Sequence, residues 1–86
     1  FSGKTADVKL LCKLDLREEI MDRFGSKIPL KAIDTEHFET TINVAISEGL
    51  VSWLMNFGDG IKILEPQSLA DSVKDRALKI INMYNE

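Results

Sequence analysis

Several features are scarce in this sequence, and each scarcity argues against a class of protein. Cys12 is the only cysteine, so an internal disulfide is excluded and a reducing cytoplasm is the natural setting. No apolar run approaches the roughly 20 residues of a membrane-spanning helix. Residues 1–4 do not begin a signal-peptide pattern. We therefore expect a cytoplasmic domain without a membrane segment.

Groups that could carry chemistry are also few. His37 is the only histidine, and there is no phosphate-binding glycine loop, Cys-x-x-Cys pair or His-Glu-x-x-His motif. Glu18 and Glu19 are adjacent on a predicted helix and point about 100° apart, so they do not face each other. Arg17 and Asn43 loosely match an Arg–Asn pair of some ferredoxin-like enzymes, but the glycine-containing anion loop is missing. We predict no catalytic site, metal site or cofactor.

What is present is typical of a soluble globular domain. The chain has 86 residues, of which 44% are hydrophobic and 29% are charged, and its net charge is −3. This length suits one domain over residues 1–86. The missing initiator methionine suggests part of a longer protein, and the acidic balance argues against general nucleic-acid binding.

Alternation of apolar and polar residues predicts strands over residues 7–14, 28–33, 38–46 and 61–64. Pro29 cannot donate a ladder hydrogen bond, so we expect the second strand at a sheet edge. The short polar segment 34–37 predicts an antiparallel hairpin of strands two and three. The residues expected to face the core are Val8, Leu10, Cys12, Ile28, Leu30, Ile42, Val44, Ile61 and Ile63.

Two helices are predicted between these strands. The first follows Asp15 as N-cap, with Glu18 in capping-box position, and ends at Gly25. The second follows Ser47 as N-cap and ends at Gly58. A third helix, capped by Ser68, continues to about residue 84. The order βαββαβα predicts an α+β ferredoxin-like sandwich, in which two helices cover one face of a four-stranded antiparallel sheet and a C-terminal helix is added.

The sheet face without helices is the first candidate surface. Four lysines and one glutamate, Glu39, lie on this predicted face, so lysines outnumber acids there. This face is typical of a solvated sheet, but it could also bind an anion or an acidic partner. RNA-recognition modules place aromatic residues there for base stacking, and none is present. The candidate anion or partner residues are Lys9, Lys13, Lys31, Lys62, Thr41 and Asn43.

Apolar residues outside the expected core are candidates for dimer or interdomain contacts. Leu11 and Ile33 lie among the lysines, while Ile81 and Tyr84 belong to the apolar side of the terminal helix. Two arrangements are open: this helix covers the free face of its own sheet, or it covers that of a second copy. Trp53 is also open to two interpretations, a core aromatic residue or an interface anchor.

The segment from Trp53 to Leu69 reads W-L-M-N-F-G-D-G-I-K-I-L-E-P-Q-S-L. It resembles the tail of bacterial WYL-domain transcriptional regulators, whose C-terminal extension has a Trp, an aromatic-Gly pair and a Pro-x-x-Leu block before a long helix. That helix ends near a tyrosine, and Tyr84 fits this position. Residues 8–14 and then 20–25 resemble the first strand and helix of the same extension, so the resemblance covers nearly the whole chain. The Trp-Tyr-Leu signature of the sensor domain is absent, since Leu54 and Met55 follow Trp53.

The resemblance implies a cytoplasmic regulator with an N-terminal winged-helix DNA reader, a central WYL sensor domain and this extension. Because both other domains lie outside these 86 residues, it implies DNA contact only through a domain that is missing here. The extension in that family is associated with dimerisation and with relaying the state of the sensor. The implied partners are therefore a second copy and the rest of its own polypeptide. The alternative is a small-ligand or anion sensor that uses the lysine-bearing face.

Overall fold

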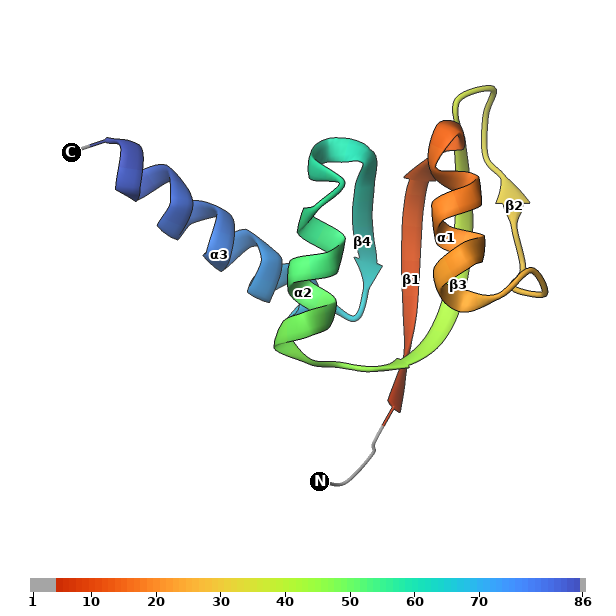
Figure 1. The fold of residues 1–86 in the computed structure, drawn as a ribbon, viewed down its shortest axis with the longest axis horizontal. Coiled ribbons are helices and arrows are strands. Elements are labelled where there is room, and N and C mark those ends of the chain that lie inside the picture. Colours follow the sequence, from red (N-terminus) through yellow and green to blue (C-terminus); the bar gives the residue numbers. More distant parts are fainter. Residues whose placement is uncertain (1–4, 86) are drawn as a thin grey trace.

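The strands of this protein form one antiparallel sheet in the order β2-β3-β1-β4 (Figure 1). The structure is a computed structural model that describes residues 5–85, so residues 1–4, where the sequence lacks a signal-peptide pattern, lie outside the described residues. β1 and β3 are the long central strands, and their register is set by the pairs Thr5↔Ala45 and Lys13↔His37. The strand bounds are Thr5–Lys13 for β1, Lys31–Ala32 for β2, His37–Ala45 for β3 and Ile61–Glu65 for β4.

The helices connect and extend this sheet. Their bounds are Arg17–Phe24 for α1, Glu48–Met55 for α2 and Gln67–Tyr84 for α3. Single 3-10 turns, Leu14–Leu16 and Gly58–Gly60, lead into α1 and β4. The α+β class, the antiparallel sheet and the C-terminal helix agree with the prediction from the sequence.

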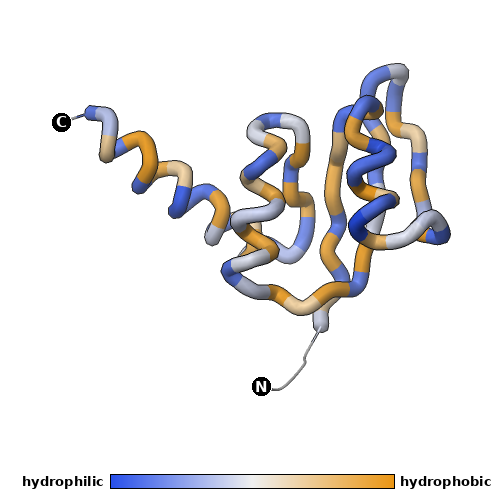
Figure 2. Tube along the Cα trace, in the orientation of Figure 1, coloured by the Kyte–Doolittle hydropathy of each residue, from blue (hydrophilic) through white to orange (hydrophobic). Residues whose placement is uncertain are grey.

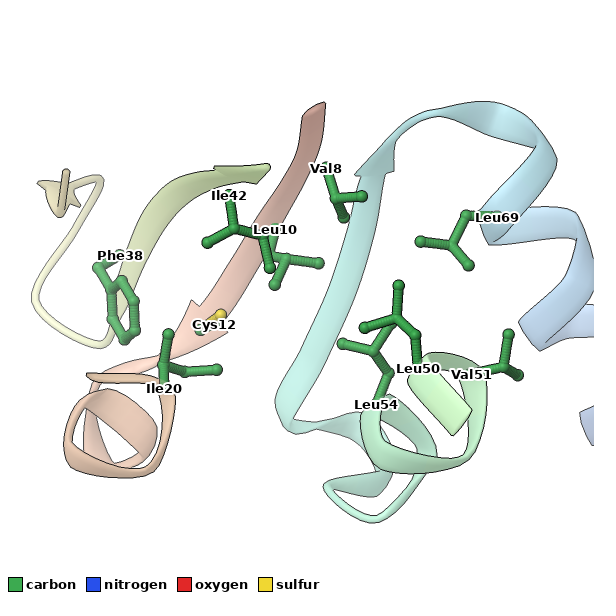
Figure 3. Close-up of a cluster of buried hydrophobic side chains, with 10 residues drawn as sticks. All are labelled: Val8, Leu10, Cys12, Ile20, Phe38, Ile42, Leu50, Val51, Leu54 and Leu69. Atoms are coloured by element: carbon green, nitrogen blue, oxygen red, sulfur yellow. The ribbon is translucent and has the colours of Figure 1, made fainter. Parts of the chain in front are cut away.

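The core lies between the sheet and the pair α1 and α2. Figure 3 shows side chains from β1 and β3 pointing toward Ile20 of α1 and toward Leu50 and Leu54 of α2. Alternate residues of each strand supply this layer, because successive side chains of a strand point to opposite faces. The buried apolar residues are Val8, Leu10, Cys12, Ile20, Phe38, Ile42, Leu50, Val51, Leu54 and Leu69.

The helix starts show which predicted caps form. The Ser47 side chain accepts a hydrogen bond from the backbone N–H of Leu50 (3.1 Å), so the predicted cap of α2 is confirmed. The predicted cap Asp15 is wrong, because a 3-10 turn comes first and places Asp15 inside it. Ser68 is also wrong as a cap: α3 begins at Gln67, and Pro66 occupies the N-cap position.

The second strand is much shorter than predicted. Only Lys31 and Ala32 pair with β3, opposite Glu39 and Phe38. Pro29 explains the late start, since its nitrogen carries no hydrogen for a ladder. Ile28 still packs against the core from outside the strand, whereas Leu30, predicted to face inward, is exposed. The predicted edge position of β2 and its hairpin with β3 are confirmed.

Candidate functional site

The sheet face opposite α1 and α2 carries the predicted charged residues in cross-strand rows. One row runs from β2 to β4 through Lys31, Glu39, Leu11 and Lys62. The next contains Thr41 opposite Lys9, and beyond it Asn43 opposite Asp7. The structure therefore places the predicted anion-binding residues on one face, at neighbouring strand positions. They also have acidic neighbours.

Several of these polar groups are already paired. Lys9 Nζ lies 3.4 Å from Glu39 Oε1, and Lys13 Nζ lies 3.5 Å from Asp59 Oδ1. Asn43 Nδ2 donates to Asp7 Oδ1 at 2.9 Å. An anion would compete with these carboxylates for the same ammonium groups. The face consequently offers a weaker anion site than four unopposed lysines would.

A register shift in β4 adds a further carboxylate. Leu10 pairs with Ile63 but its neighbour Lys9 pairs with Glu65, so one residue of β4, Leu64, is extra at that point. Regular alternation would have put Leu64 on the free face. The shift puts Glu65 opposite Lys9, so the expectation of a single glutamate among the lysines is wrong.

The predicted apolar contacts of this face are dispersed. Leu11 is half-buried and has Glu39 and Lys62 as its cross-strand neighbours. Ile33, 46% exposed, follows β2, and its backbone N–H donates to the carbonyl of His37. Because β3 separates β2 from β1, Ile33 and Leu11 form no continuous apolar strip across the sheet.

The terminal helix α3 is the second candidate surface, and it does not cover the free sheet face of its own domain. It contacts β4 and α2, and its outer turns extend away from the body (Figure 1). Hydrophobic positions recur along these outer turns (Figure 2). The exposed fractions of the apolar residues there are 49% for Leu78, 43% for Ile80, 52% for Ile81, 69% for Met83 and 81% for Tyr84.

The inner half of α3 is attached to the domain. Leu69 is 1% exposed and belongs to the core, and Val73 packs against that core. Arg76 donates to the Ser52 hydroxyl at 2.8 Å and forms an ion pair with the Glu48 carboxylate, both on α2. These contacts anchor the first half of the helix and leave Ile81 and Tyr84, the predicted contact residues, exposed beyond it.

The groups considered for catalysis are not brought together. Cys12 pairs with Phe38, and His37 pairs with Lys13, the next position along the sheet. Because successive side chains of a strand point to opposite faces, Cys12 and His37 lie on opposite faces of the sheet. Asn43 lies six residues beyond His37 along β3, about 20 Å from the end of the sheet where Arg17 begins α1. Among residues 5–85, no cluster of three His, Cys, Asp or Glu side chains could hold a metal ion.

His37 is half-buried and takes part in the hairpin. Its Nδ1 lies 2.9 Å from Asp34 Oδ1, and the backbone N–H of Glu36 donates to the same oxygen at 2.7 Å. The hydrogen bond from Glu36 and the contact with His37 lower the pKa of the Asp34 carboxyl. This arrangement is that of an Asx-type turn closing the hairpin.

An aromatic cluster joins α1 to α2 and was not identified from the sequence. Phe24 and Phe57 both lie edge-on to Trp53, with ring centroids 5.2 Å and 4.9 Å from it. The Arg23 guanidinium lies 5.8 Å from the Trp53 ring. Trp53 is half-buried and packs against the core, as the core interpretation expects. The sequence signal for this cluster was the Phe-Gly pair at the end of each predicted helix, Phe24-Gly25 and Phe57-Gly58.

The chain matches the family model of the WCX domain over residues 4–81, and it belongs to this family. This match confirms the family resemblance seen in the sequence. The WCX domain is the C-terminal extension of WYL-domain transcriptional regulators, and the family is non-catalytic. No curated protein is similar enough to count as a match. Within residues 5–85, no helix is both long and apolar enough to cross a membrane.

Proposed function

We propose that this WCX domain is the regulatory and dimerisation module of a cytoplasmic bacterial WYL-domain regulator. It relays the state of a sensor domain to a winged-helix DNA-binding domain, both of which lie outside this chain. The observation that carries the proposal is the outer half of α3, which presents large apolar side chains that its own domain does not cover. An uncovered apolar surface of this kind is typical of a protein-interaction site.

The ferredoxin-like arrangement is part of the same proposal. The element order βαββαβα and the strand order β2-β3-β1-β4, with both crossover helices against one core, support it. In this arrangement the long strands β1 and β3 hold one face for the core and leave the other free.

The test is the oligomeric state of two forms, the 86-residue chain and the full-length regulator that carries it. Sedimentation velocity over a concentration series is expected to show reversible self-association of both. Removal of the WCX domain from the regulator is expected to weaken dimerisation and the DNA binding that depends on it. A strict monomer in both forms, up to the highest soluble concentration, would contradict the proposal.

Anion sensing by Lys9, Lys13, Lys31 and Lys62 stays a prediction. The assembly role is favoured over it because Glu39 and Asp59 already form ion pairs with two of these lysines and Glu65 lies opposite Lys9 in the sheet.

A further inference from the structure

The outer half of α3 has a residue pattern that fits a second copy of itself. At 100° per residue, Ala77 and Tyr84 fall within about 20° of one another on the helix surface. The line along the helix midway between Ala77 and Tyr84 has Ile80 about 50° to one side and Ile81 about 50° to the other. These four positions are symmetric about the midpoint between the two isoleucines, so an antiparallel copy would set the stripe against itself with Ala77 opposite Tyr84, as a two-fold interface allows.

We propose that α3 is the dimer contact of this domain and pairs antiparallel with α3 of a second copy about a two-fold axis between Ile80 and Ile81. This proposal rests on the proposed dimerisation function and names its surface. Ile80 and Ile81 of both copies form the central layer. Ala77 lies beside the partner subunit's Tyr84, so the smallest side chain of the stripe is opposite the largest.

The charge pattern agrees with a second copy as the occupant. Between Ala77 and Tyr84 the only charged residue is Lys79, which lies on the opposite side of the helix from the stripe, near Asn82. Two copies can therefore approach without placing like charges against each other. Lys74 lies three residues before Ala77, and Arg76, which directly precedes Ala77, is already held by Glu48 of α2.

The stripe is continuous with the packed half of the same helix. Val73 and Leu69, one and two turns before Ala77, face the domain's own core, and the same side of the helix then runs on beyond the body. Since Leu69 and Val73 are occupied, the free overlap is the last eight residues, about 12 Å of helix. A contact of this length lies below the area of a stable standard interface, so we expect weak, concentration-dependent pairing of the isolated domain.

The first experiment compares Ile81→Lys with Asn82→Lys in sedimentation velocity. Both add one lysine near the end of α3, but only position 81 lies in the stripe. Ile81→Lys is expected to raise the concentration at which association is half complete by at least about tenfold, and Asn82→Lys by less than about twofold. Circular dichroism checks that both variants keep the helix. Equal association of the two variants would overturn the proposal.

The second experiment tests the register by disulfide cross-linking. The pair Ala77→Cys/Tyr84→Cys brings cysteines of two copies together at the proposed contact, so mild oxidation is expected to give a covalent dimer. The control pair is an equimolar mixture of the single variants Lys79→Cys and Asn82→Cys, which cannot form a disulfide within one chain; these positions have the same symmetry about the axis but lie on the far side of the helix, so the mixture is expected to stay monomeric at the same concentration. Equal cross-linking of both pairs would contradict the register.

The two proposals fail in different ways. If the domain and the full-length regulator dimerise but Ile81→Lys and the cysteine pairs have no specific effect, the α3 contact is wrong and the dimerisation role stands. If both proteins are strict monomers, the dimerisation role and the α3 contact both fall.

Discussion

Thr40 is buried to 98% of its surface, and among residues 5–85 its hydroxyl Oγ1 finds no hydrogen-bond partner. It lies in the inward set of β3 between Phe38 and Ile42, where an apolar residue would suit the core. A buried polar group without a partner costs about 1–3 kcal/mol relative to hydration. Thr40 is therefore a local weakness of the core.

We expect Thr40→Val to raise the free energy of unfolding by about 1 kcal/mol, since valine keeps the shape and removes the unpaired hydroxyl. Thr41→Val is the matched control, because Thr41 lies next in the chain on the exposed face and should change stability by no more than about 0.5 kcal/mol. Urea unfolding of the three proteins measures both differences. A loss of stability in Thr40→Val would show that the hydroxyl has a partner.

Cys12 illustrates how burial changes a titratable group. It is fully buried, and desolvation raises the pKa of its thiol from 9.0 to about 12. The unfolded chain releases this proton near pH 9, while the folded chain keeps it. Stability from this group is therefore fully present below about pH 9 and is lost as the pH rises toward 12.

The wild-type protein should lose about 1.4 kcal/mol per pH unit more than Cys12→Ala above about pH 9, because alanine has no proton to release. Unfolding by urea at pH 8 and at pH 10 gives the comparison, and the shared lysine and tyrosine titrations cancel. Parallel pH profiles of the two proteins would show that the thiol ionises equally in both states.

At the scale of elements, α3 combines two roles along one amphipathic stripe. Its inner turns belong to the monomer through Leu69 and Val73, and its outer turns are free for Ile80 and Ile81 to contact a partner. The ion pair of Arg76 with Glu48 lies on exposed parts of both helices and contributes little by itself. The attachment of α3 consequently depends on its apolar inner turn.

Leu69→Ala is expected to reduce the free energy of unfolding by about 2–5 kcal/mol, because it removes a buried side chain from the core. Leu78→Ala, on the half-exposed outer part of the same helix, should cost less than about 1 kcal/mol. Chemical denaturation at a concentration where the domain is monomeric separates the two. Equal losses would mean that the inner turn is no better packed than the outer one.

At the scale of the whole molecule, the net charge of −3 and the paired lysines of the free sheet face act together. Three of the four predicted anion-binding lysines lie beside a carboxylate: Lys9 and Lys13 form ion pairs, and Lys31 lies opposite Glu39. Local neutralisation of this kind lowers the potential that would collect anions. Assembly through α3 does not depend on this potential.

Inorganic phosphate is therefore expected to raise the melting temperature above that in chloride of equal ionic strength only through its general exclusion from protein surfaces, which needs no binding site. The variant with all four lysines, at positions 9, 13, 31 and 62, changed to glutamine should behave like the wild type in this comparison. Differential scanning fluorimetry is the measurement. A phosphate-specific stabilisation of the wild type that the glutamine variant loses would support the anion-sensing alternative.

Local patterns in the sequence predicted most of the fold. The alternation around Phe38 and Ile42 and the cap at Ser47 were sufficient for β3 and α2. Local patterns failed at two element starts, those of α1 and β2. The 3-10 turn before α1 displaced Asp15 from its cap, and Pro29 left too few donors for a long β2.

The sequence alone determined the alternating strands, the helical stripes and the family, because side-chain periodicity and short motifs follow from neighbouring residues in the chain. Only the tertiary structure decided which groups meet across the sheet. The register shift that places Glu65 opposite Lys9 depends on how β4 settles against β1. The direction of α3 likewise depends on Leu69 finding space in the core beside α2, which leaves Ile81 and Tyr84 uncovered. These outcomes rest on contacts between residues far apart in the chain, and local patterning carries no record of them.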